Sequence, residues 1–145
     1  SKIGSLRLKK EYMFSYHRVI RVKDTDMTGI IYFANLLQIA LEAFEELLRL
    51  SNYSLKAMVS ERDYLLPIVH TEADFFSPIS VGEEIQVKLK FDKIGTTSFS
   101  YLAELCNGSI EVGRVSIVHV VYSKNEKKSI PIPNDLMEIL VKNKL

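Results

Sequence analysis

The chain has 145 residues, of which 47% are hydrophobic and 26% charged, a balance typical of one globular domain spanning residues 1–145. Its 19 basic and 18 acidic residues give a net charge of +1, and no basic block is long enough to favour nucleic-acid binding. No apolar run approaches the roughly 20 residues that a helix needs to cross a bilayer. A single cysteine, Cys106, excludes a disulfide within the chain. We therefore expect a soluble, cytoplasmic protein with no membrane or nucleic-acid partner.

A first strand is predicted by the sequence YMFSYHRVIRVK at residues 12–23. Its residues follow an imperfect period of two, and one side of the strand carries Phe14, Tyr16, Arg18, Ile20 and Val22.

The next stretch, residues 24–50, is the one around which the chain is organised. It opens with the turn formers Asp24, Thr25, Asp26, Thr28 and Gly29. It continues as a helix of roughly 17 residues. The helix has apolar residues at steps of three and four, namely Leu37, Ala40, Leu41, Phe44, Leu47 and Leu48, with Leu36 and Ile39 widening the stripe. Such a helix could fill the concave side of a sheet.

Strands dominate the rest of the chain. They are predicted at residues 65–76, 84–92, 98–105 and 112–122, with a hairpin turn at Asn107-Gly108. Two short helices are predicted at residues 54–64 and 131–142, with Ser54 and Asn134 as their N-caps. Consecutive strands with short turns favour an antiparallel sheet, so the predicted fold class is α+β, with the long helix covering one sheet face.

Two carboxylates, Asp24 and Asp26, precede the N-terminus of the long helix, where free N–H groups and partial positive charge gather. In one interpretation they only build the turn or cap the helix. In the other, Asp26 is a nucleophile or general base, and the helix N-terminus is the oxyanion site that ester or thioester hydrolysis needs. A calcium loop of the EF-hand type is disfavoured, because a strand precedes the loop and Asn35 stands where a Glu is expected.

The other candidate ligands and nucleophiles are isolated in the sequence. His17, His70 and His119 lack metal-binding spacing, so no metal site is predicted, and His119 is interpreted as a hydrogen-bonded core or interface residue. Cys106 follows no nucleophile motif and is interpreted as a free, buried thiol.

The pattern D-T-D-x-x-G-I-I-Y-F-A-N, followed by a helix that carries E-A-F-E, resembles the active-site segment of the hotdog-fold acyl-CoA thioesterases of the 4-hydroxybenzoyl-CoA thioesterase family. The resemblance implies a five-stranded antiparallel sheet wrapped around a long central helix. It implies that Asp26 is catalytic and that the backbone N–H of Phe33 polarises the thioester carbonyl, helped by the backbone from Gly29 to Tyr32. It also implies a homodimer or homotetramer with active sites between subunits. No cofactor is expected, since coenzyme A is part of the substrate.

A second stretch, LPIVHTEADFFSPISVGEEIQVKLKF at residues 66–91, is similar to the branch that hydrolyses 1,4-dihydroxy-2-naphthoyl-CoA in quinone biosynthesis. An aromatic acyl group also suits the predicted pocket borders, which are Tyr32, Phe33, Val69, His70, Phe75 and Phe76. One of the last two must be core, because adjacent strand residues face opposite ways.

Four residues are predicted to bind the substrate: Tyr32, His70, Lys93 and Ser98. His70 could bond a ring hydroxyl. The loop from Lys93 to Ser98 corresponds to one that meets the coenzyme A phosphates in relatives, but only Lys93 is basic here. The chain also departs from some relatives at Leu41, where they carry His or Tyr.

Three rival functions remain open on the sequence alone. They are a general short- or medium-chain acyl-CoA thioesterase, a hotdog hydratase or dehydratase, and a non-catalytic module that binds acyl-CoA or lipid. The absence of a histidine from residues 24–50 disfavours the hydratase, and Asp26 disfavours the binding module.

Overall fold

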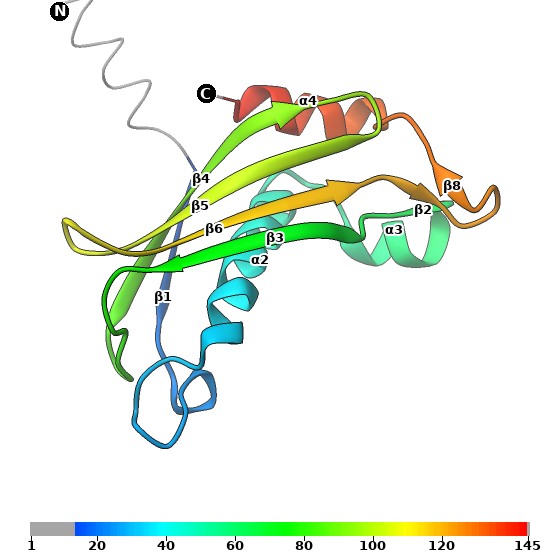
Figure 1. Ribbon diagram of the computed structural model, residues 1–145. Coiled ribbons are helices and arrows are strands. Elements are labelled where there is room, and N and C mark those ends of the chain that lie inside the picture. Colours follow the sequence, from blue (N-terminus) through cyan, green and yellow to red (C-terminus); the bar gives the residue numbers. More distant parts are fainter. Residues whose placement is uncertain (1–13, 145) are drawn as a thin grey trace, which may run out of the picture.

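The long helix α2 (Phe33–Leu50) lies across one face of a curved five-stranded sheet (Figure 1). The computed structural model describes residues 14–144. None of the helices in this part of the chain is long and apolar enough to span a membrane. The other elements are β1 (Ser15–Val19), the 3-10 helix η1 (Val22–Asp24), α3 (Leu55–Glu61), β2 (Tyr64–Leu65), β3 (Ile68–Phe75), β4 (Glu84–Ile94), β5 (Ser98–Asn107), β6 (Ile110–Val120), β7 (Tyr122–Ser123), β8 (Lys128–Ser129) and α4 (Asn134–Lys142).

The main sheet has the strand order β1-β4-β5-β6-β3, and every neighbouring pair is antiparallel. The predicted α+β class and the hairpin between β5 and β6 are therefore confirmed. Asn107 pairs with Ile110 across that hairpin, and Gly108 in the turn has a positive φ of 62°. A second, three-stranded sheet, β2-β7-β8, was not predicted. Its strands have two residues each, too few to produce a periodic pattern.

The core lies between α2 and the inner face of the sheet. The buried residues of α2 are Leu36, Ile39, Ala40, Ala43, Phe44, Leu47 and Leu48. The three central strands contribute Ile85, Val87, Leu89, Phe91, Phe99, Tyr101, Ala103, Leu105, Val115, Ile117 and His119. The predicted helix is confirmed, but its buried stripe includes Ala43 and leaves Leu37 and Leu41 half-buried.

An aromatic cluster around Phe44 contains the one buried histidine of the described residues. The Phe44 ring stacks on Tyr101 with 5.0 Å between centroids and lies 4.9 Å from His119. A carbonyl can only accept, so Nδ1 of His119 donates to the C=O of Leu66 at 3.0 Å, and Nε2 accepts from the hydroxyl of Tyr101 at 3.1 Å. His119 is therefore a hydrogen-bonded core residue, as predicted, and burial lowers its pKa.

Several element ends differ from the prediction. The first strand ends at Val19 instead of continuing to residue 23, because the N–H of Asp24 bonds the C=O of Arg21 at 2.9 Å and closes the turn η1. Residues 12 and 13 of that prediction lie outside the described residues. Ser54 caps α3 as predicted, since its side chain accepts the N–H of Ala57 at 3.0 Å. Asn134 is wrong as an N-cap: α4 begins at Asn134 itself, and Pro133 precedes it. A proline fits there because the start of a helix needs no N–H from it.

Cys106 lies near the end of β5. It is free and buried, as predicted, and burial raises the pKa of its thiol.

Acidification should weaken the fold through His119. Burial lowers its pKa below the ordinary value of about 6.5. Below about pH 6.5 the unfolded chain therefore binds a proton that the folded chain does not, down to the folded-state pKa. The contribution of neutral His119 to the free energy of unfolding should be complete above about pH 6.5 and should fall as the pH drops below it.

Denaturant unfolding at about pH 7.5 and 5.5 measures this effect. His119→Gln can still donate one hydrogen bond and accept another, but it does not titrate. The loss of stability between the two pH values should be smaller in this variant than in the parent chain. An equal loss in both proteins would contradict the assignment to His119.

Candidate active site at the N-terminus of helix α2

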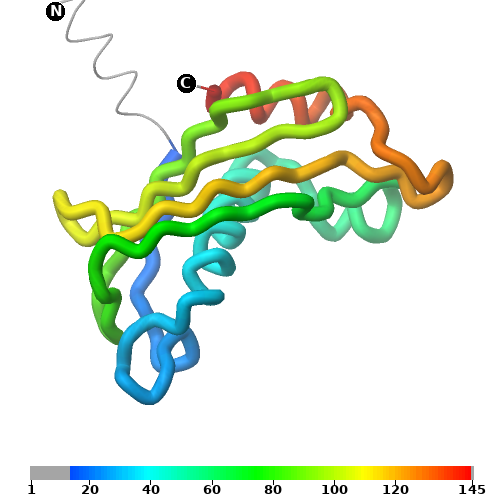
Figure 2. The backbone as a smooth tube through the Cα atoms, in the orientation of Figure 1, coloured from blue at the N-terminus to red at the C-terminus, as the bar shows by residue number. Residues whose placement is uncertain are grey.

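The loop between η1 and α2 is a closed hairpin that protrudes at one end of the molecule (Figure 2). The N–H of Tyr32 donates to the C=O of Asp24 at 2.9 Å, and the N–H of Asp26 donates to the C=O of Ile30 at 3.0 Å. The N–H of Gly29 closes the tip by donating to the C=O of Asp26 at 3.1 Å. Gly29 has a φ of 77°, a left-handed conformation that a residue with a Cβ adopts only with strain. The positive φ explains why glycine stands at position 29.

The hairpin is also attached to the segment that precedes β4. The N–H of Ile31 donates to the C=O of Ile79 at 2.8 Å, and the N–H of Val81 donates to the C=O of Gly29 at 3.0 Å. Backbone pairing on both sides fixes the course of the loop, so the side chains on it project from a defined frame.

Asp26 is exposed near the tip of this hairpin. One of its carboxylate oxygens, Oδ1, accepts the backbone N–H of Thr28 at 2.8 Å and also the Thr28 hydroxyl. These hydrogen bonds from Thr28 hold the pKa of Asp26 below its ordinary value. The carboxylate is therefore charged at neutral pH, as a nucleophile or general base must be. Thr28 was predicted only as a turn former; its position two residues after an aspartate is the sequence signal for this contact.

Phe33 is the first residue of α2, and Tyr32 precedes it in an extended conformation. The N–H groups of a first helical turn have no partner within the helix. Tyr32 occupies the N-cap position of α2, and its side chain makes no capping hydrogen bond. The two rings lie 4.7 Å apart and are 46% and 61% exposed. Asp26, Gly29, Tyr32 and Phe33 thus lie on one backbone-paired hairpin and the helix start that follows it, where the positive end of the helix dipole lies.

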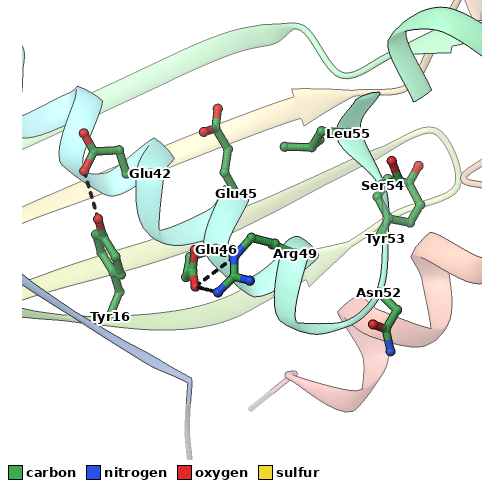
Figure 3. A pocket seen from close by; sticks show the side chains of 9 residues that line it. All are labelled: Tyr16, Glu42, Glu45, Glu46, Arg49, Asn52, Tyr53, Ser54 and Leu55. Atoms are coloured by element: carbon green, nitrogen blue, oxygen red, sulfur yellow. Dashed lines mark hydrogen bonds and ion pairs between the residues drawn. The ribbon is translucent and has the colours of Figure 1, made fainter. Parts of the chain in front are cut away.

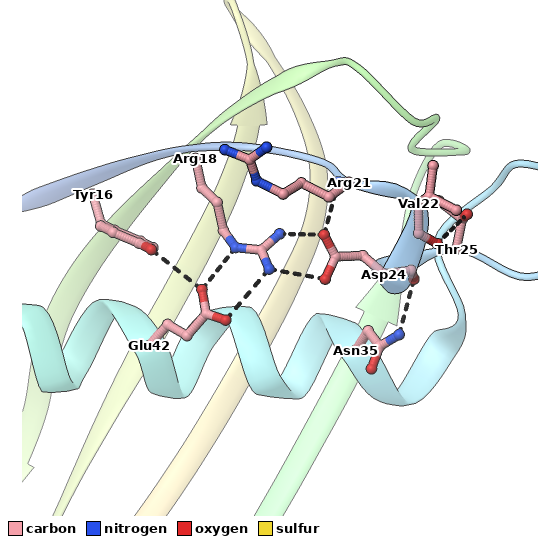
Figure 4. Close-up of polar contacts among 8 residues, drawn as sticks. All are labelled: Tyr16, Arg18, Arg21, Val22, Asp24, Thr25, Asn35 and Glu42. Carbon is pink, nitrogen blue, oxygen red and sulfur yellow. Dashed lines mark hydrogen bonds and ion pairs between the residues drawn. The ribbon is translucent and has the colours of Figure 1, made fainter.

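A largely buried ion-pair network joins the base of this loop to α2 (Figure 4). The guanidinium of Arg18 donates to both oxygens of Asp24 at 2.6 and 2.8 Å, and its Nε lies 2.7 Å from a carboxylate oxygen of Glu42. Asp24 is buried, and the hydrogen bonds from Arg18 lower its pKa. The structural interpretation is therefore correct for Asp24. The roles of Arg18 and Glu42 were missed, although a cation on the apolar side of the first strand was a signal for a buried partner.

The other predicted binding residues lie elsewhere in the chain. His70, Lys93 and Ser98 line a hollow of about 450 Å³ on the outer sheet face, together with Asp92, Gly95, Phe99, Ser100, Ser116 and Val118. Nε2 of His70 lies 2.8 Å from a carboxylate oxygen of Glu72. The structure thus brings three of the four predicted binding residues together.

The expectation that His70 borders one cavity with Tyr32 and Phe33 is wrong within a single chain. His70 pairs with Val118, whereas Phe75 pairs with Gly113, which packs against Leu36 in the first part of α2. His70 therefore lies about 16 Å along β3 from Phe75, the residue at the level of the first part of α2, at about 3.3 Å per residue. It also faces away from α2, because it lies on the outer sheet face.

The expectation that Phe75 or Phe76 is core is also wrong in a single chain. The two side chains are 48% and 51% exposed, and Val69 is 59% exposed. Phe75 lies on an edge strand opposite Gly113, which has no side chain to cover it. Phe76 follows the strand and lies under the guanidinium of Arg114 at 5.6 Å.

A further hollow of about 610 Å³ lies where α2 meets α3 (Figure 3). Its acidic side chains are largely paired: Glu42 accepts the hydroxyl of Tyr16 at 3.2 Å, and Glu46 accepts Nε of Arg49 at 3.0 Å. It contains none of the predicted site residues. Among residues 14–144, no three His, Cys, Asp or Glu side chains are grouped so that they could hold a metal ion.

Known proteins share both the sequence pattern and the fold. The thioesterase-like superfamily matches residues 20–140. The 1,4-dihydroxy-2-naphthoyl-CoA hydrolase of Nostoc punctiforme is 33% identical over 131 residues, which cover 90% of this chain and 88% of that protein. The enzyme of the same name from Rippkaea orientalis is also 33% identical over 131 residues, covering 88% of this chain and 95% of that protein.

Solved structures agree with this result. The crystal structure of a 1,4-dihydroxy-2-naphthoyl-CoA thioesterase from Synechocystis has a TM-score of 0.84 at 30% identity, covering 89% of this chain and 96% of that one. A gentisyl-coenzyme A thioesterase has a TM-score of 0.77 at 17% identity, a likeness of fold alone. The chain therefore belongs to the thioesterase-like superfamily and has the hotdog thioesterase fold. Within the superfamily it is similar over most of its length to the 1,4-dihydroxy-2-naphthoyl-CoA hydrolases.

Proposed function

We propose that this protein is an acyl-CoA thioesterase that hydrolyses 1,4-dihydroxy-2-naphthoyl-CoA to the free acid and coenzyme A. The observation that carries the proposal is the ionised carboxylate of Asp26 on the hairpin whose backbone pairs with Tyr32, the residue before the uncapped N-terminus of α2. Thioester hydrolysis needs these two parts, a group that attacks or activates water and donors for the developing oxyanion. The acyl group is supported by relatives of that name at 33% identity over most of the chain.

The proposed reaction begins at the thioester carbonyl. Asp26 either takes a proton from the water that attacks the carbonyl carbon or attacks that carbon itself, forming an anhydride that water then hydrolyses. In both cases the carbonyl oxygen gains negative charge, which the N–H of Phe33 and the helix dipole stabilise. The C–S bond then breaks, and coenzyme A leaves as a thiolate that takes up a proton. On the second route this step forms the anhydride, and its hydrolysis by water follows. The tight turn at Gly29 supports this geometry by closing the tip of the loop that carries Asp26.

We assign the hollow on the outer sheet face to the coenzyme A part of the substrate. Lys93 supplies a positive charge for a phosphate, while His70 and Ser98 supply hydrogen bonds from the same hollow. Tyr32 lies beside Phe33 and is assigned to the acyl part, where its half-exposed ring offers a stacking surface for an aromatic group.

The proposed assembly is a homodimer through the edge strand β3, with a homotetramer as the next level. Seven of the eight residues of β3 are exposed in the single chain, and its outer edge has no partner among residues 14–144. Such an edge is a template for pairing with a second strand. Antiparallel pairing about a two-fold axis sets the start of one β3 beside the end of the other. It would therefore bring the His70 end of one chain near the partner's Phe75 and helix N-terminus, which supports an active site between subunits.

The proposed reaction uses only water and the acyl-CoA ester, so it requires no separate cofactor. We place the enzyme in the cytoplasm, because acyl-CoA esters are intracellular substrates and the single buried Cys106 suits a reducing compartment.

Asp26→Asn keeps the size of the side chain and removes its negative charge. We expect kcat for 1,4-dihydroxy-2-naphthoyl-CoA to fall by about 10² or more, because amide nitrogen and oxygen are poor bases. Release of the coenzyme A thiol measures the rate. Asp135→Asn, at an exposed aspartate of α4, is the matched control and should keep the parent rate. Near-full turnover by folded Asp26→Asn would contradict the catalytic assignment.

The substrate preference is tested with a panel of acyl-CoA esters. We expect kcat/KM for dihydroxynaphthoyl- or hydroxybenzoyl-CoA to exceed that for palmitoyl-CoA at least about tenfold, or about 1.4 kcal/mol of transition-state binding. His70→Ala should raise KM for all the esters alike, since His70 lies beside Lys93 and Ser98. A loss of kcat/KM confined to the hydroxylated aromatic esters would instead place His70 against the ring hydroxyl. Equal rates across the panel would leave a general acyl-CoA thioesterase.

Light scattering at micromolar concentration tests the assembly. We expect a mass of two or four chains for the parent protein. Val69→Glu places a charge on the exposed edge strand and should shift the mass towards one chain, because a buried unpaired charge opposes association. Val141→Glu alters a similarly exposed valine on α4 and should keep the parent mass. A parent protein with the mass of one chain would contradict the proposed dimer.

A further inference from the structure

We infer that Arg18 is a positioning residue that holds the loop at residues 24–32 and helix α2 in one fixed relation, and so sets the geometry between the Asp26 carboxylate and the Phe33 N–H. The inference deepens the proposed function, because that function gives these two groups their roles. Arg18 touches neither group and acts through the atoms that lie between them.

The first attachment of Arg18 is to the base of the loop. Two nitrogens of its guanidinium donate to the two oxygens of Asp24, at 2.6 and 2.8 Å. The Arg18 side chain is only 11% exposed and that of Asp24 only 7%. A two-point contact between planar groups fixes orientation as well as distance. The Asp24 carboxylate also accepts the N–H of Arg21 at 2.8 Å, so the turn that leads into the loop is held from the same side.

The second attachment is to the helix. Nε of Arg18 lies 2.7 Å from a carboxylate oxygen of Glu42, which is in the third turn of α2. Glu42 is itself held by the hydroxyl of Tyr16 on β1, at 3.2 Å. Figure 4 shows the guanidinium between the two carboxylates, one from the loop and one from the helix. One side chain of β1 thus contacts both parts of the site.

The backbone of Asp24 carries this constraint to the reacting groups. Its C=O accepts the N–H of Tyr32 at 2.9 Å and the side-chain amide of Asn35 at 2.9 Å. Tyr32 immediately precedes Phe33, and Asn35 is in the first turn of α2. In the other direction, Asp26 is two residues from Asp24 on the same hairpin. A shift of Asp24 would therefore change the distance from the Asp26 carboxylate to the helix N-terminus.

A lysine cannot make this set of contacts. Its ammonium is a single point charge, whereas the guanidinium presents five N–H donors in a planar fork. Arg18→Lys keeps the buried positive charge but loses the two-sided contact. It is therefore the variant that separates positioning from simple charge neutralisation.

Steady-state kinetics with the dihydroxynaphthoyl-CoA ester form the first test. We expect kcat of Arg18→Lys to fall at least about tenfold with KM within about threefold, because small misplacements of reacting groups act on the chemical step. Arg49→Lys is the matched control: Arg49 also forks onto a carboxylate, Glu46, at the far end of the same helix. Its kcat should stay within about twofold of the parent.

A second variant removes only the last link and leaves every buried charge paired. Asn35→Ala deletes the side-chain bond to the C=O of Asp24. Its kcat should also fall with KM kept, and it decides the question if Arg18→Lys does not fold. Asn143→Ala is its control, because Asn143 donates a similar bond to the C=O of Ile139 at 2.7 Å on α4. Parent turnover in folded Arg18→Lys and Asn35→Ala would overturn the inference.

Amide hydrogen exchange gives a readout that does not depend on activity. The N–H groups of Asp26, Gly29 and Tyr32 are bonded inside the loop, and they should exchange faster in Arg18→Lys than in the parent or in Arg49→Lys. Unchanged exchange would overturn the anchoring role. If Asp26→Asn proves fully active while exchange in Arg18→Lys is faster, the catalytic assignment fails and the anchoring role stands.

Discussion

The burial of one helix face against one sheet face is the interaction on which this structure depends. Seven side chains of α2 and the inward side chains of β4, β5 and β6 form a single core. Each large apolar side chain removed from water contributes roughly 1.5–3 kcal/mol. Because α2 lies along the sheet, its first turn reaches the part of β6 that contains Gly113. A Cβ at Gly113 would lie 3.1 Å from a methyl group of Leu36, so glycine allows this close approach. The position of the proposed site thus follows from core packing.

Electrostatics then fixes what packing leaves free. The loop at residues 24–32 buries Ile31 in the core, and its backbone pairs with itself and with the segment before β4. Its side-chain attachment to the third turn of α2 runs through Arg18. This attachment has a cost, since the guanidinium of Arg18 and the carboxylate of Asp24 leave water, while the carboxylate of Glu42 stays partly exposed. Removing one member of such a buried group is typically destabilising by about 3–5 kcal/mol, because the remaining charge is left without a partner. The tyrosine hydroxyl and backbone groups around the network satisfy the remaining oxygens.

The two edges of the sheet explain why a single chain leaves large apolar side chains exposed. β1 lies at one edge and is tied by Arg18 to the loop and helix, while β3 lies at the other with most of its residues exposed. Val69, Phe75 and Phe76 are apolar side chains that a single chain leaves about half exposed. Apolar residues along an unpaired edge are a liability unless another surface covers them. The two groups of predicted site residues lie near opposite ends of this edge strand. The proposed pairing of two β3 strands would therefore bring the coenzyme A group of one chain near the catalytic group of the other.

The sequence by itself determined the main helix, the strands of the larger sheet and the identity of the catalytic candidates. Periodicity located α2 and the inward residues of the central strands, because those signals are local and repeat along the chain. The order of turn formers and the resemblance singled out Asp26, Gly29 and Phe33. Tertiary structure alone decided which distant residues meet. The pairing of Arg18 with Asp24 and Glu42, the outward position of His70 and the exposure of Phe75 depend on strand order and sheet edges. A residue pattern of period two or 3.6 shows which face a side chain takes, but it does not show which strand becomes an edge or which charge lies opposite.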